Sequence, residues 1–378
     1  MNPDHRLRTL VLGGYGNFGA RIARALAQDP QIALVVGGRD AHRAAAAAAA
    51  LGAEALGIDA LADDLAARLK REGVGLVVHT AGPFQQQDWR VAEAAAAAGA
   101  HYIDLADGRR FVCDFAGALD ARFRAAGRSA ITGASTLPAL STAAVDELTR
   151  GWQRIESIHS CIAPAQTAPR GVATLEAVLG YCGAPVRVWQ DGRWIEQTGW
   201  ADPVAVHFAR LQPRLGALCD VPDLELLPAR HPGVQAVGFR AALELSITQR
   251  GLAALAALRR AGLLRRPERL ARLLHRAADW LDPFARGGTG AMVLRVQGSD
   301  AAGNPARRSW HVTAGNDHGP EIPCMAAILL ARRLAHGEAL PIGAMPCAGL
   351  LTLDDFAPEF ARWGMLVDVL DEPPPAGG

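Results

Sequence analysis

The segment Leu12-Gly13-Gly14-Tyr15-Gly16-Asn17-Phe18-Gly19 decides the fold of the N-terminal half. It has the spacing G-x-G-x-x-G, follows an apolar run at residues 8–12 and precedes apolar residues at helical spacing. Such a turn between a strand and a helix places free N–H groups against the phosphates of a dinucleotide. We interpret Gly14 as permitting the tight turn, Gly16 as the point where the backbone approaches the pyrophosphate, and Gly19 as the contact between helix and strand. Three further residues complete the predicted cofactor-binding turn: Tyr15, Asn17 and Phe18.

The rest of the first 150 residues alternates between short apolar runs and helical patterns. Strands joined by helices form right-handed crossovers and therefore a parallel sheet. The apolar runs are continuous, as expected for strands that are covered on both faces. The predicted strands after the first are residues 32–36, 55–58, 74–79, 101–104 and 129–132, and the predicted helices are 18–28, 43–51, 61–70 and 85–98. We therefore expect an α/β protein in which residues 1–150 form a doubly wound Rossmann domain.

The strict alternation of strands and helices ends at about residue 151. The pattern of residues 151–320 predicts a second, α+β domain with a mainly antiparallel sheet, for substrate binding or dimerisation. Polar and apolar residues alternate at 155–162, and a D-G turn joins 185–189 to 193–195, which is typical of a hairpin. Residues 292–298 and 308–314 form a second expected antiparallel pair.

Composition excludes several classes of protein. The chain has 378 residues and a formal net charge of +1, which does not favour a nucleic-acid partner. We expect a cytoplasmic protein without an integral membrane segment, because no signal-peptide pattern or apolar run of about 20 residues is present. The six cysteines are scattered, and we expect reduced thiols and no metal site. The basic, leucine-rich segment 250–279 is interpreted as a solvated face of packed helices, with a membrane-surface helix as the alternative.

The second strand indicates the cofactor. It ends in Val36-Gly37-Gly38-Arg39-Asp40, whereas sites for NAD place an acid there to bind the ribose hydroxyls. Gly38 leaves room at that place, and the guanidinium of Arg39 can pair with a 2′-phosphate, with His42 and Arg43 adding charge. We predict NADP(H) as the preferred cofactor, with NAD(H) possible. In the alternative reading, Asp40 binds the ribose of NAD and Arg39 is a solvated surface charge.

Two later segments carry a resemblance to a known family. Residues 77–84 read Val-Val-His-Thr-Ala-Gly-Pro-Phe, and residues 99–108 read Gly-Ala-His-Tyr-Ile-Asp-Leu-Ala-Asp-Gly. With the glycine-rich turn and residues 133–142, they make residues 7–150 resemble the saccharopine dehydrogenase-like oxidoreductases. Beyond this range the likeness is looser and rests on residues 169–171 and 318–320.

The resemblance implies NAD(P) binding, a second α+β domain that helps to form the active site, and a helix at 322–335 that returns to the Rossmann domain. Residues 321–378 would thus form a C-terminal segment with this helix, and we expect its tail at residues 373–378 to be disordered. The activity implied is reversible formation or reduction of a carbon–nitrogen bond between an amino acid and a carbonyl compound. The chain has no recognisable cluster of Arg and Lys for several substrate carboxylates, which argues against saccharopine itself.

Candidate active-site residues follow the fourth and fifth strands. In a doubly wound sheet, ligands bind beyond the carboxyl ends of the strands. Asp104 and Asp107 lie at one such end, where a carboxylate can orient substrate or move a proton. In the alternative reading they cap a helix that begins near Gly108. The expected neighbours of the ribose and nicotinamide are Thr80, Ala81, Gly82, Pro83 and Phe84.

Three loops of the second half are further candidates. Arg170 precedes a helical pattern and can clamp a carboxylate, residues 286–290 form a glycine-rich loop, and His318 can act as an acid or base. The ordinary alternative is that such loop charges are solvated and such glycines make turns.

These features favour an enzyme that transfers hydride between a nicotinamide cofactor and a small-molecule C–N (imine or amine) or carbonyl substrate, as a possible homodimer. One alternative is a non-catalytic NADPH-binding sensor or scaffold, because neither a Tyr-x-x-x-Lys nor a Ser-His-Asp constellation is recognisable. Another is a membrane-associated reductase of lipid intermediates, which the segment 250–279 would serve.

Overall fold

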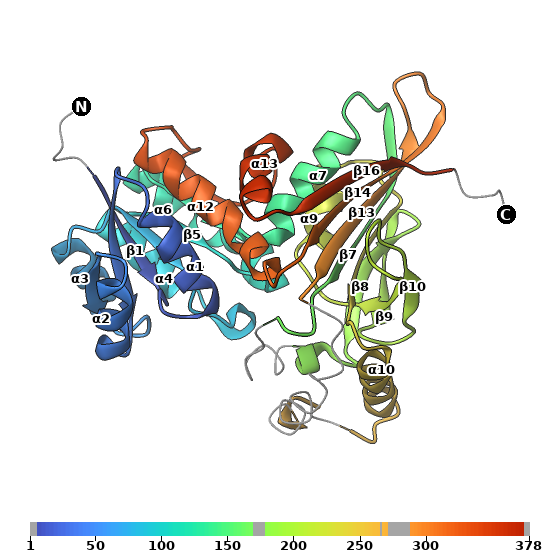
Figure 1. Ribbon diagram of the computed structural model, residues 1–378, viewed down its shortest axis with the longest axis horizontal. Coiled ribbons are helices and arrows are strands. Elements are labelled where there is room, and N and C mark those ends of the chain that lie inside the picture. The colour runs from blue at the N-terminus through green and yellow to red at the C-terminus, as the bar shows by residue number, and fades with distance from the viewer. Residues whose placement is uncertain (1–5, 169–177, 265–266, 271–287, 374–378) are drawn as a thin grey trace. The chain divides into compact units, whose positions relative to one another are not determined.

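The computed structural model describes residues 6–168, 178–264, 267–270 and 288–373 (Figure 1). The chain divides into two compact units. Unit 1 comprises Met1–Leu140 and Glu321–Leu351, and unit 2 comprises Ser141–Pro320 and Thr352–Gly378. Each unit is built on one sheet, called sheet A in unit 1 and sheet B in unit 2.

Sheet A has seven parallel strands in the order β15-β6-β5-β4-β1-β2-β3. Their bounds are β1 Leu7–Leu12, β2 Ile32–Gly38, β3 Glu54–Gly57, β4 Leu76–His79, β5 His101–Asp104, β6 Ser129–Thr132 and β15 Gly343–Pro346. The chain runs outward from β1 in one direction through β2 and β3, and then in the other direction from β4. This is the doubly wound order, so the predicted α/β Rossmann architecture is confirmed.

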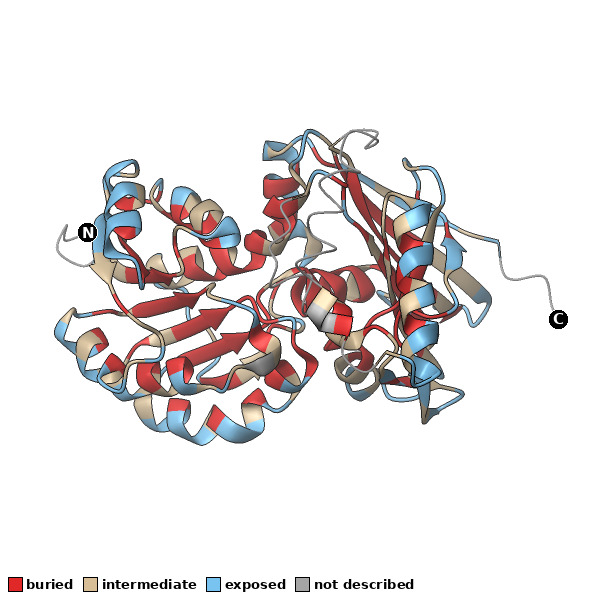
Figure 2. Cartoon of the chain, turned by 90° about the horizontal axis from the view of Figure 1, so that it is seen from below, coloured by how far each residue is buried: buried red, intermediate tan, exposed pale blue. Residues whose placement is uncertain are grey.

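Helices cover both faces of sheet A, which explains why its strands are apolar throughout. Leu10, Val11, Val77 and Val78 are fully buried although neighbouring side chains point to opposite faces. Figure 2 shows buried strands between helices whose outer sides are exposed. Helices α1 and α12 pack on each other, and α4 packs on both α3 and α6. The helices of this unit are α1 Asn17–Leu26, α2 Ala41–Ala49, α3 Leu65–Arg71, η1 Phe84–Gln86, α4 Arg90–Ala98, α5 Arg109–Cys113, α6 Phe115–Ala126, the π-helical stretch η2 Thr136–Leu140, and α12 Ile322–Ala335.

Two predicted helices begin later than the sequence pattern indicates. The helix expected at 61–70 begins at Leu65, because the Asp59 carboxylate accepts a hydrogen bond from Leu61 N at 3.0 Å and holds a turn there. The helix expected at 85–98 is split into η1 and α4. Between them, the Gln87 side chain donates to backbone carbonyls of the preceding loop instead of continuing a helix.

Sheet B is mixed and mostly antiparallel, as predicted. Its main order is β10-β11-β12-β7-β13-β14-β16, with β8 attached to β12 and β9 to β8. Strand β7 is parallel to β12 and antiparallel to β13. The bounds are β7 Arg154–Ala163, β8 Pro185–Gln190, β9 Arg193–Thr198, β10 Val204–Val206, β11 Arg214–Leu218, β12 Ala236–Ala242, β13 Gly290–Ser299, β14 Pro305–Ala314 and β16 Leu366–Asp371.

The predicted D-G hairpin is confirmed between β8 and β9. Asp191 (φ 52°) and Gly192 (φ 69°) both take positive φ, as a two-residue turn of type I′ requires. The helical elements around sheet B are α7 Ser141–Leu148, α9 Asp223–Arg230, α10 Ser246–Arg260, η3 Pro267–Leu270, η5 Gly319–Glu321 and α13 Leu353–Arg362. Helix α10 covers the first part of the basic segment, and residues 271–279 of that segment lie outside the described residues.

Within the described ranges, no helix is both long enough and apolar enough to span a bilayer. All six cysteines are free thiols, and each except Cys113 is buried.

Candidate functional site

The glycine-rich turn joins β1 to α1 and depends on close backbone approach. Gly13 has φ +86°, a left-handed conformation that glycine adopts without steric cost. Gly14 is required for another reason, because a Cβ there would lie 2.8 Å from Val11 O. A Cβ on Gly19 would overlap Gly13 O and lie 2.5 Å from Thr80 Oγ1. The missing side chains therefore allow α1 to lie directly against β1 and β4.

The N-terminus of α1 is open to an anionic ligand. Gly16 is its N-cap, and no side chain caps the helix. The first helical hydrogen bond runs from Ala20 N to Gly16 O, and the N–H groups of Asn17, Phe18 and Gly19 have no acceptor in the described part of the chain. Unsatisfied donors at the positive end of a helix suit a pyrophosphate, so this turn fits a dinucleotide.

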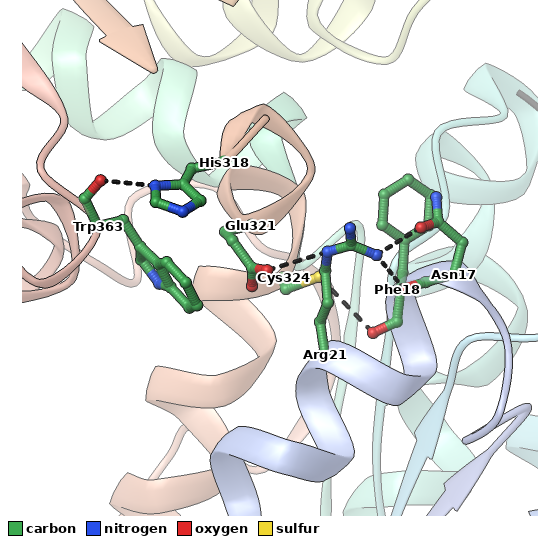
Figure 3. A network of polar contacts seen from close by, with 7 residues as sticks. All are labelled: Asn17, Phe18, Arg21, His318, Glu321, Cys324 and Trp363. Carbon is green, nitrogen blue, oxygen red and sulfur yellow. Dashed lines mark hydrogen bonds and ion pairs between the residues drawn. The ribbon is translucent and has the colours of Figure 1, made fainter. Parts of the chain in front are cut away.

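Helix α12 holds the first turn of α1 in place (Figure 3). Arg21 donates from Nε to the Glu321 carboxylate at 3.0 Å and from a terminal nitrogen to Asn17 O at 2.7 Å. The Cys324 thiol donates to Phe18 O at 3.7 Å. Asn17 and Phe18, both predicted for the cofactor turn, are therefore positioned from a segment some 300 residues away in the chain.

At the end of β2, the side chain of Tyr15 fills the space that was expected to be empty. A Cβ on Gly38 would lie 2.6 Å from the Tyr15 hydroxyl and would overlap its ring. Gly38 therefore accommodates Tyr15 rather than leaving open room. The Tyr15 hydroxyl accepts from Asp40 N at 3.0 Å, and the Arg43 guanidinium lies 4.6 Å from the ring centroid. Tyr15 thus joins the glycine-rich turn to the start of α2.

The two charged candidates beside Tyr15 differ in whether they already have a hydrogen-bond partner. Asp40 is the N-cap of α2, and its carboxylate accepts from Arg43 N at 3.0 Å. Arg39 is exposed, and its guanidinium makes no hydrogen bond or ion pair with any described residue. Arg39 is therefore the available cation at this end of the sheet, while one oxygen of Asp40 is already in use.

The loop after β4, residues 80–84, is attached to the same turn. Thr80 Oγ1 donates to Leu12 O at 2.9 Å, which joins the ends of β4 and β1. The Gln87 amide donates to Ala81 O at 2.7 Å and to Pro83 O at 2.9 Å. Gln87 was not predicted from the sequence, because an amide that bonds backbone carbonyls leaves no periodic or charge signal. Gly82 lies within this loop, and Gly82 N donates to Thr80 O at 3.1 Å.

Asp104 and Asp107 have different surroundings at the end of β5. Asp104 is fully buried, and its Oδ1 accepts from Ala106 N (2.9 Å), Thr132 Oγ1 (2.9 Å) and Gly133 N (2.8 Å). Asp107 is exposed and accepts from the Gln85 amide at 3.0 Å. Helix α5 has Gly108 as its N-cap without a side-chain hydrogen bond, so the reading in which these residues cap the helix is wrong.

A buried polar network that was not predicted from the sequence lies at the ends of β4 and β5. Nδ1 of His79 and the Tyr102 hydroxyl share a hydrogen bond of 3.0 Å, and the edge of Phe84 packs on the His79 ring. His79 Nε2 and Asp104 Oδ2 have no hydrogen-bond partner among the described residues. In the strand register, His79 lies opposite Asp104. Polar residues that end two neighbouring apolar strands were the available signal.

Burial sets the charge of this network. Loss of solvation lowers the pKa of His79 to about 4 and raises the pKa of Asp104 to about 6, although three donors to Asp104 oppose that rise. Burial and the nearby Asp104 carboxylate also raise the pKa of Tyr102 well above its ordinary value. At neutral pH the network therefore holds a neutral imidazole, a neutral phenol and a largely ionised carboxylate.

Residues 9–131 match the family model of the saccharopine dehydrogenase NADP binding domain. The resemblance read from the sequence is thereby confirmed, and an NAD(P)-dependent oxidoreductase is indicated. The matched range includes the glycine-rich turn, the end of β2, residues 80–84, Asp104 and Asp107. No curated protein sequence matches the chain.

Two solved structures with very different sequences share the fold. Saccharopine dehydrogenase (L-Glu forming) from Saccharomyces cerevisiae, in its apo, histidine-tagged form, matches with a TM-score of 0.69 at 15% identity, covering 97% of this chain and 100% of that one. Homospermidine synthase from Legionella pneumophila, in complex with NAD, matches with a TM-score of 0.63 at 9% identity, covering 97% of this chain and 91% of that one. At such identities the matches show the fold alone.

The remaining candidates lie outside the matched residues 9–131. His318, in unit 2, is half-buried, donates from Nδ1 to Trp363 O at 2.9 Å and packs edge-on against the Trp363 ring (Figure 3). This contact fixes the tautomer and leaves Nε2 as the nitrogen that can exchange a proton. Arg170 lies outside the described residues, as do residues 286 and 287 of the glycine-rich loop.

The loop before His318 is shaped by two consecutive residues with positive φ, Asn316 (53°) and Asp317 (58°). Asn and Asp tolerate this conformation better than other side chains. Thr167 Oγ1 donates to the Asp317 carboxylate, and Asp317 N donates to Gly288 O at 2.9 Å. A Cβ on Gly288 would overlap that carboxylate, so the missing side chain at Gly288 makes room for Asp317.

Proposed function

We propose that the chain binds NADP(H) at the β1–α1 turn and transfers hydride to or from a C–N (imine or amine) or carbonyl substrate. The observation that carries the proposal is the uncapped N-terminus of α1 behind a glycine-rich turn, within a matched NADP binding domain. The nicotinamide cofactor would supply the hydride chemistry, and the protein supplies binding and orientation.

Preference for NADP(H) rests on the residues around Tyr15. Arg39 has a guanidinium without a partner among the described residues, and Arg43 lies over the Tyr15 ring. The Tyr15 hydroxyl accepts from Asp40 N, so its own proton is available to donate. Two guanidinium groups and one hydroxyl donor near the end of β2 suit a 2′-phosphate better than a bare ribose.

The candidate residues are given two different proposed roles, positioning of the surrounding loops and contact with the substrate. Asp104 is a positioning residue, because its three hydrogen bonds hold the loops after β5 and β6. Asp107, which is exposed, and His318, through Nε2, are the groups proposed to orient substrate or to move a proton. Arg170 remains the proposed clamp for a substrate carboxylate.

A matched pair of arginine variants tests the cofactor preference. Arg39→Ala removes the proposed 2′-phosphate contact, and Arg24→Ala removes an exposed arginine of α1 as the control. A hydrogen bond between charged groups contributes about 1.5–3 kcal/mol, so Arg39→Ala is expected to raise the Kd of NADPH roughly 10- to 100-fold. The Kd of NADH should not change, and Arg24→Ala should change neither. Equal weakening of both cofactors by Arg39→Ala would contradict the assignment.

Turnover is tested with NADPH and a panel of imines formed from amino acids and carbonyl compounds, with the carbonyl compounds alone as a second panel. Oxidation of NADPH by at least one member supports the proposed reaction. Asp107→Asn and His318→Gln should then lower kcat while leaving the Kd of NADPH unchanged. Firm NADPH binding without oxidation by any member of either panel would favour a sensor instead.

A further inference from the structure

Helix α10 (Ser246–Arg260) has two opposite faces, and one of them packs on β11 of sheet B. The buried residues of this face are Gln249, Leu252 and Ala256. The Cys182 thiol donates to Leu252 O at 3.2 Å, and the Arg259 guanidinium donates to Gly180 O at 2.8 Å. Figure 1 shows α10 below the strands of unit 2. The contacts of one face therefore hold the helix on this unit, and the opposite face is turned outward.

The outward face of α10 carries an apolar stripe. Its members recur at the helical spacing i, i+4, i+7 and i+11, and they are Ile247, Gly251, Ala254 and Leu258, all of them exposed. With 3.6 residues per turn, this row lies opposite the buried residues. Single exposed apolar side chains are common on protein surfaces, whereas a continuous apolar row marks a surface that binds a partner.

The end of α10 adds one more leucine to the stripe. Gly262 takes φ +75°, Gly262 N donates to Arg259 O at 3.0 Å, and Leu263 N donates to Leu258 O at 3.0 Å. These two bonds form a Schellman motif, which directs Leu263 back toward the last turn of the helix. Leu263 is 77% exposed and Ile247 is 70% exposed, the two largest values for large apolar side chains in the described part of the chain. Both therefore belong to one surface.

The charge around the stripe indicates the partner. Residues 246–264 contain three arginines and no aspartate or glutamate. Arg250 and Arg260 are exposed, and neither makes a hydrogen bond or ion pair with a described residue. An apolar stripe bordered by unpaired cations suits a surface that places negative charge above an apolar layer. The surface of an anionic phospholipid bilayer has both properties.

We propose that the apolar stripe of α10 docks on the surface of an anionic phospholipid bilayer, with the helix lying parallel to the membrane plane. The side chains of Ile247, Leu258 and Leu263 enter the boundary between headgroups and acyl chains. Arg250 and Arg260 contact the lipid phosphates at the sides of the stripe. This proposal does not depend on the proposed cofactor or reaction.

The test is flotation of the full-length chain with vesicles in a density gradient. One set of vesicles is phosphatidylcholine alone, and the other contains equal parts of phosphatidylcholine and phosphatidylglycerol. The double variant Ile247→Gln/Leu258→Gln removes two apolar side chains without adding charge. The double variant Arg250→Gln/Arg260→Gln removes two charges and keeps the stripe.

The matched controls carry the same substitutions in unit 1. Leu61→Gln replaces a leucine that is 60% exposed, and Arg24→Gln replaces an exposed arginine of α1. Circular dichroism checks that every variant is folded, so that loss of binding is not caused by unfolding.

We expect the natural chain to float with the phosphatidylglycerol vesicles but not with phosphatidylcholine alone, and to be released by about 0.5 M salt. Each double variant should bind the anionic vesicles at least roughly 10-fold more weakly, and both controls should bind like the natural chain.

Failure of the natural chain to bind the anionic vesicles would overturn the proposal. Equal binding to both kinds of vesicle would do the same, as would unchanged binding of either folded double variant. If the natural chain stays unbound and Ile247→Gln/Leu258→Gln lowers its mass in solution, the stripe is an interface between copies of the chain, which also overturns the proposal.

Discussion

Replacing Asp104 tests whether this buried carboxylate holds the end of sheet A together. Asp104→Ala removes the acceptor of three hydrogen bonds and leaves Ala106 N, Thr132 Oγ1 and Gly133 N without it. Each donor that loses a buried partner costs about 1–3 kcal/mol, and the hydroxyl can turn to another acceptor, so we expect a loss of about 3–5 kcal/mol. Asp104→Asn keeps an oxygen in the same place and should cost about 1 kcal/mol.

The comparison of these two variants removes the effect of ionisation, because neither can carry the charge. In the natural chain, burial raises the pKa of Asp104 to about 6 from the ordinary 3.8. Its stabilising contribution is therefore complete below pH 3.8 and declines by about 3 kcal/mol in total as the pH rises through 6, with about half of this decline expected between pH 5 and pH 8. Urea unfolding at pH 5 and pH 8, followed by circular dichroism, measures both effects.

The expected result is that Asp104→Asn is about 2 kcal/mol or more above Asp104→Ala in free energy of unfolding at both pH values. Asp104→Asn should also show a weaker decline with pH than the natural chain. Equal stability of the two variants would refute the positioning role, because the three donors would then gain nothing from the oxygen.

Three further predictions concern other parts of the chain. Gly19→Ala should abolish NADPH binding and lower the melting temperature, because its Cβ would overlap Gly13 O, whereas Gly117→Ala, at an open position in the first turn of α6, should be neutral or stabilising. Burial raises the pKa of Asp223 to about 7, so stability should fall as the pH rises from about 4 to 7, and thermal unfolding of Asp223→Asn should show a smaller fall. Gly192→Ala, at φ +69°, should cost about 1 kcal/mol in urea unfolding, and an unchanged stability would contradict the I′ turn.

The strands of sheet A were predictable because their apolar runs are continuous and bounded by polar or glycine residues. The predicted bounds 101–104 and 129–132 coincide with β5 and β6. Strand β15 (Gly343–Pro346) was not predicted, since its four residues, Gly-Ala-Met-Pro, have little preference for extended structure. It is a strand because it pairs with β6, a contact between segments more than 200 residues apart.

The candidate site was predictable where a single segment carries the chemistry, as in the glycine-rich turn. Contacts between segments were not, because they depend on strand register and on which side chain fills a space. The sequence suggests open space beside Gly38, but the Tyr15 ring fills that space. His79 and Tyr102 meet only because β4 and β5 are neighbours in a particular register.

The most direct test of the central claim is a calorimetric titration of the purified chain with NADPH and, separately, with NADH. We expect saturable binding of one nucleotide per chain, tighter for NADPH than for NADH. Tighter binding of NADH would contradict the role given to Arg39 and favour Asp40 as the ribose ligand. Binding of neither nucleotide would contradict the account as a whole, because the open N-terminus of α1 would then have no dinucleotide to hold.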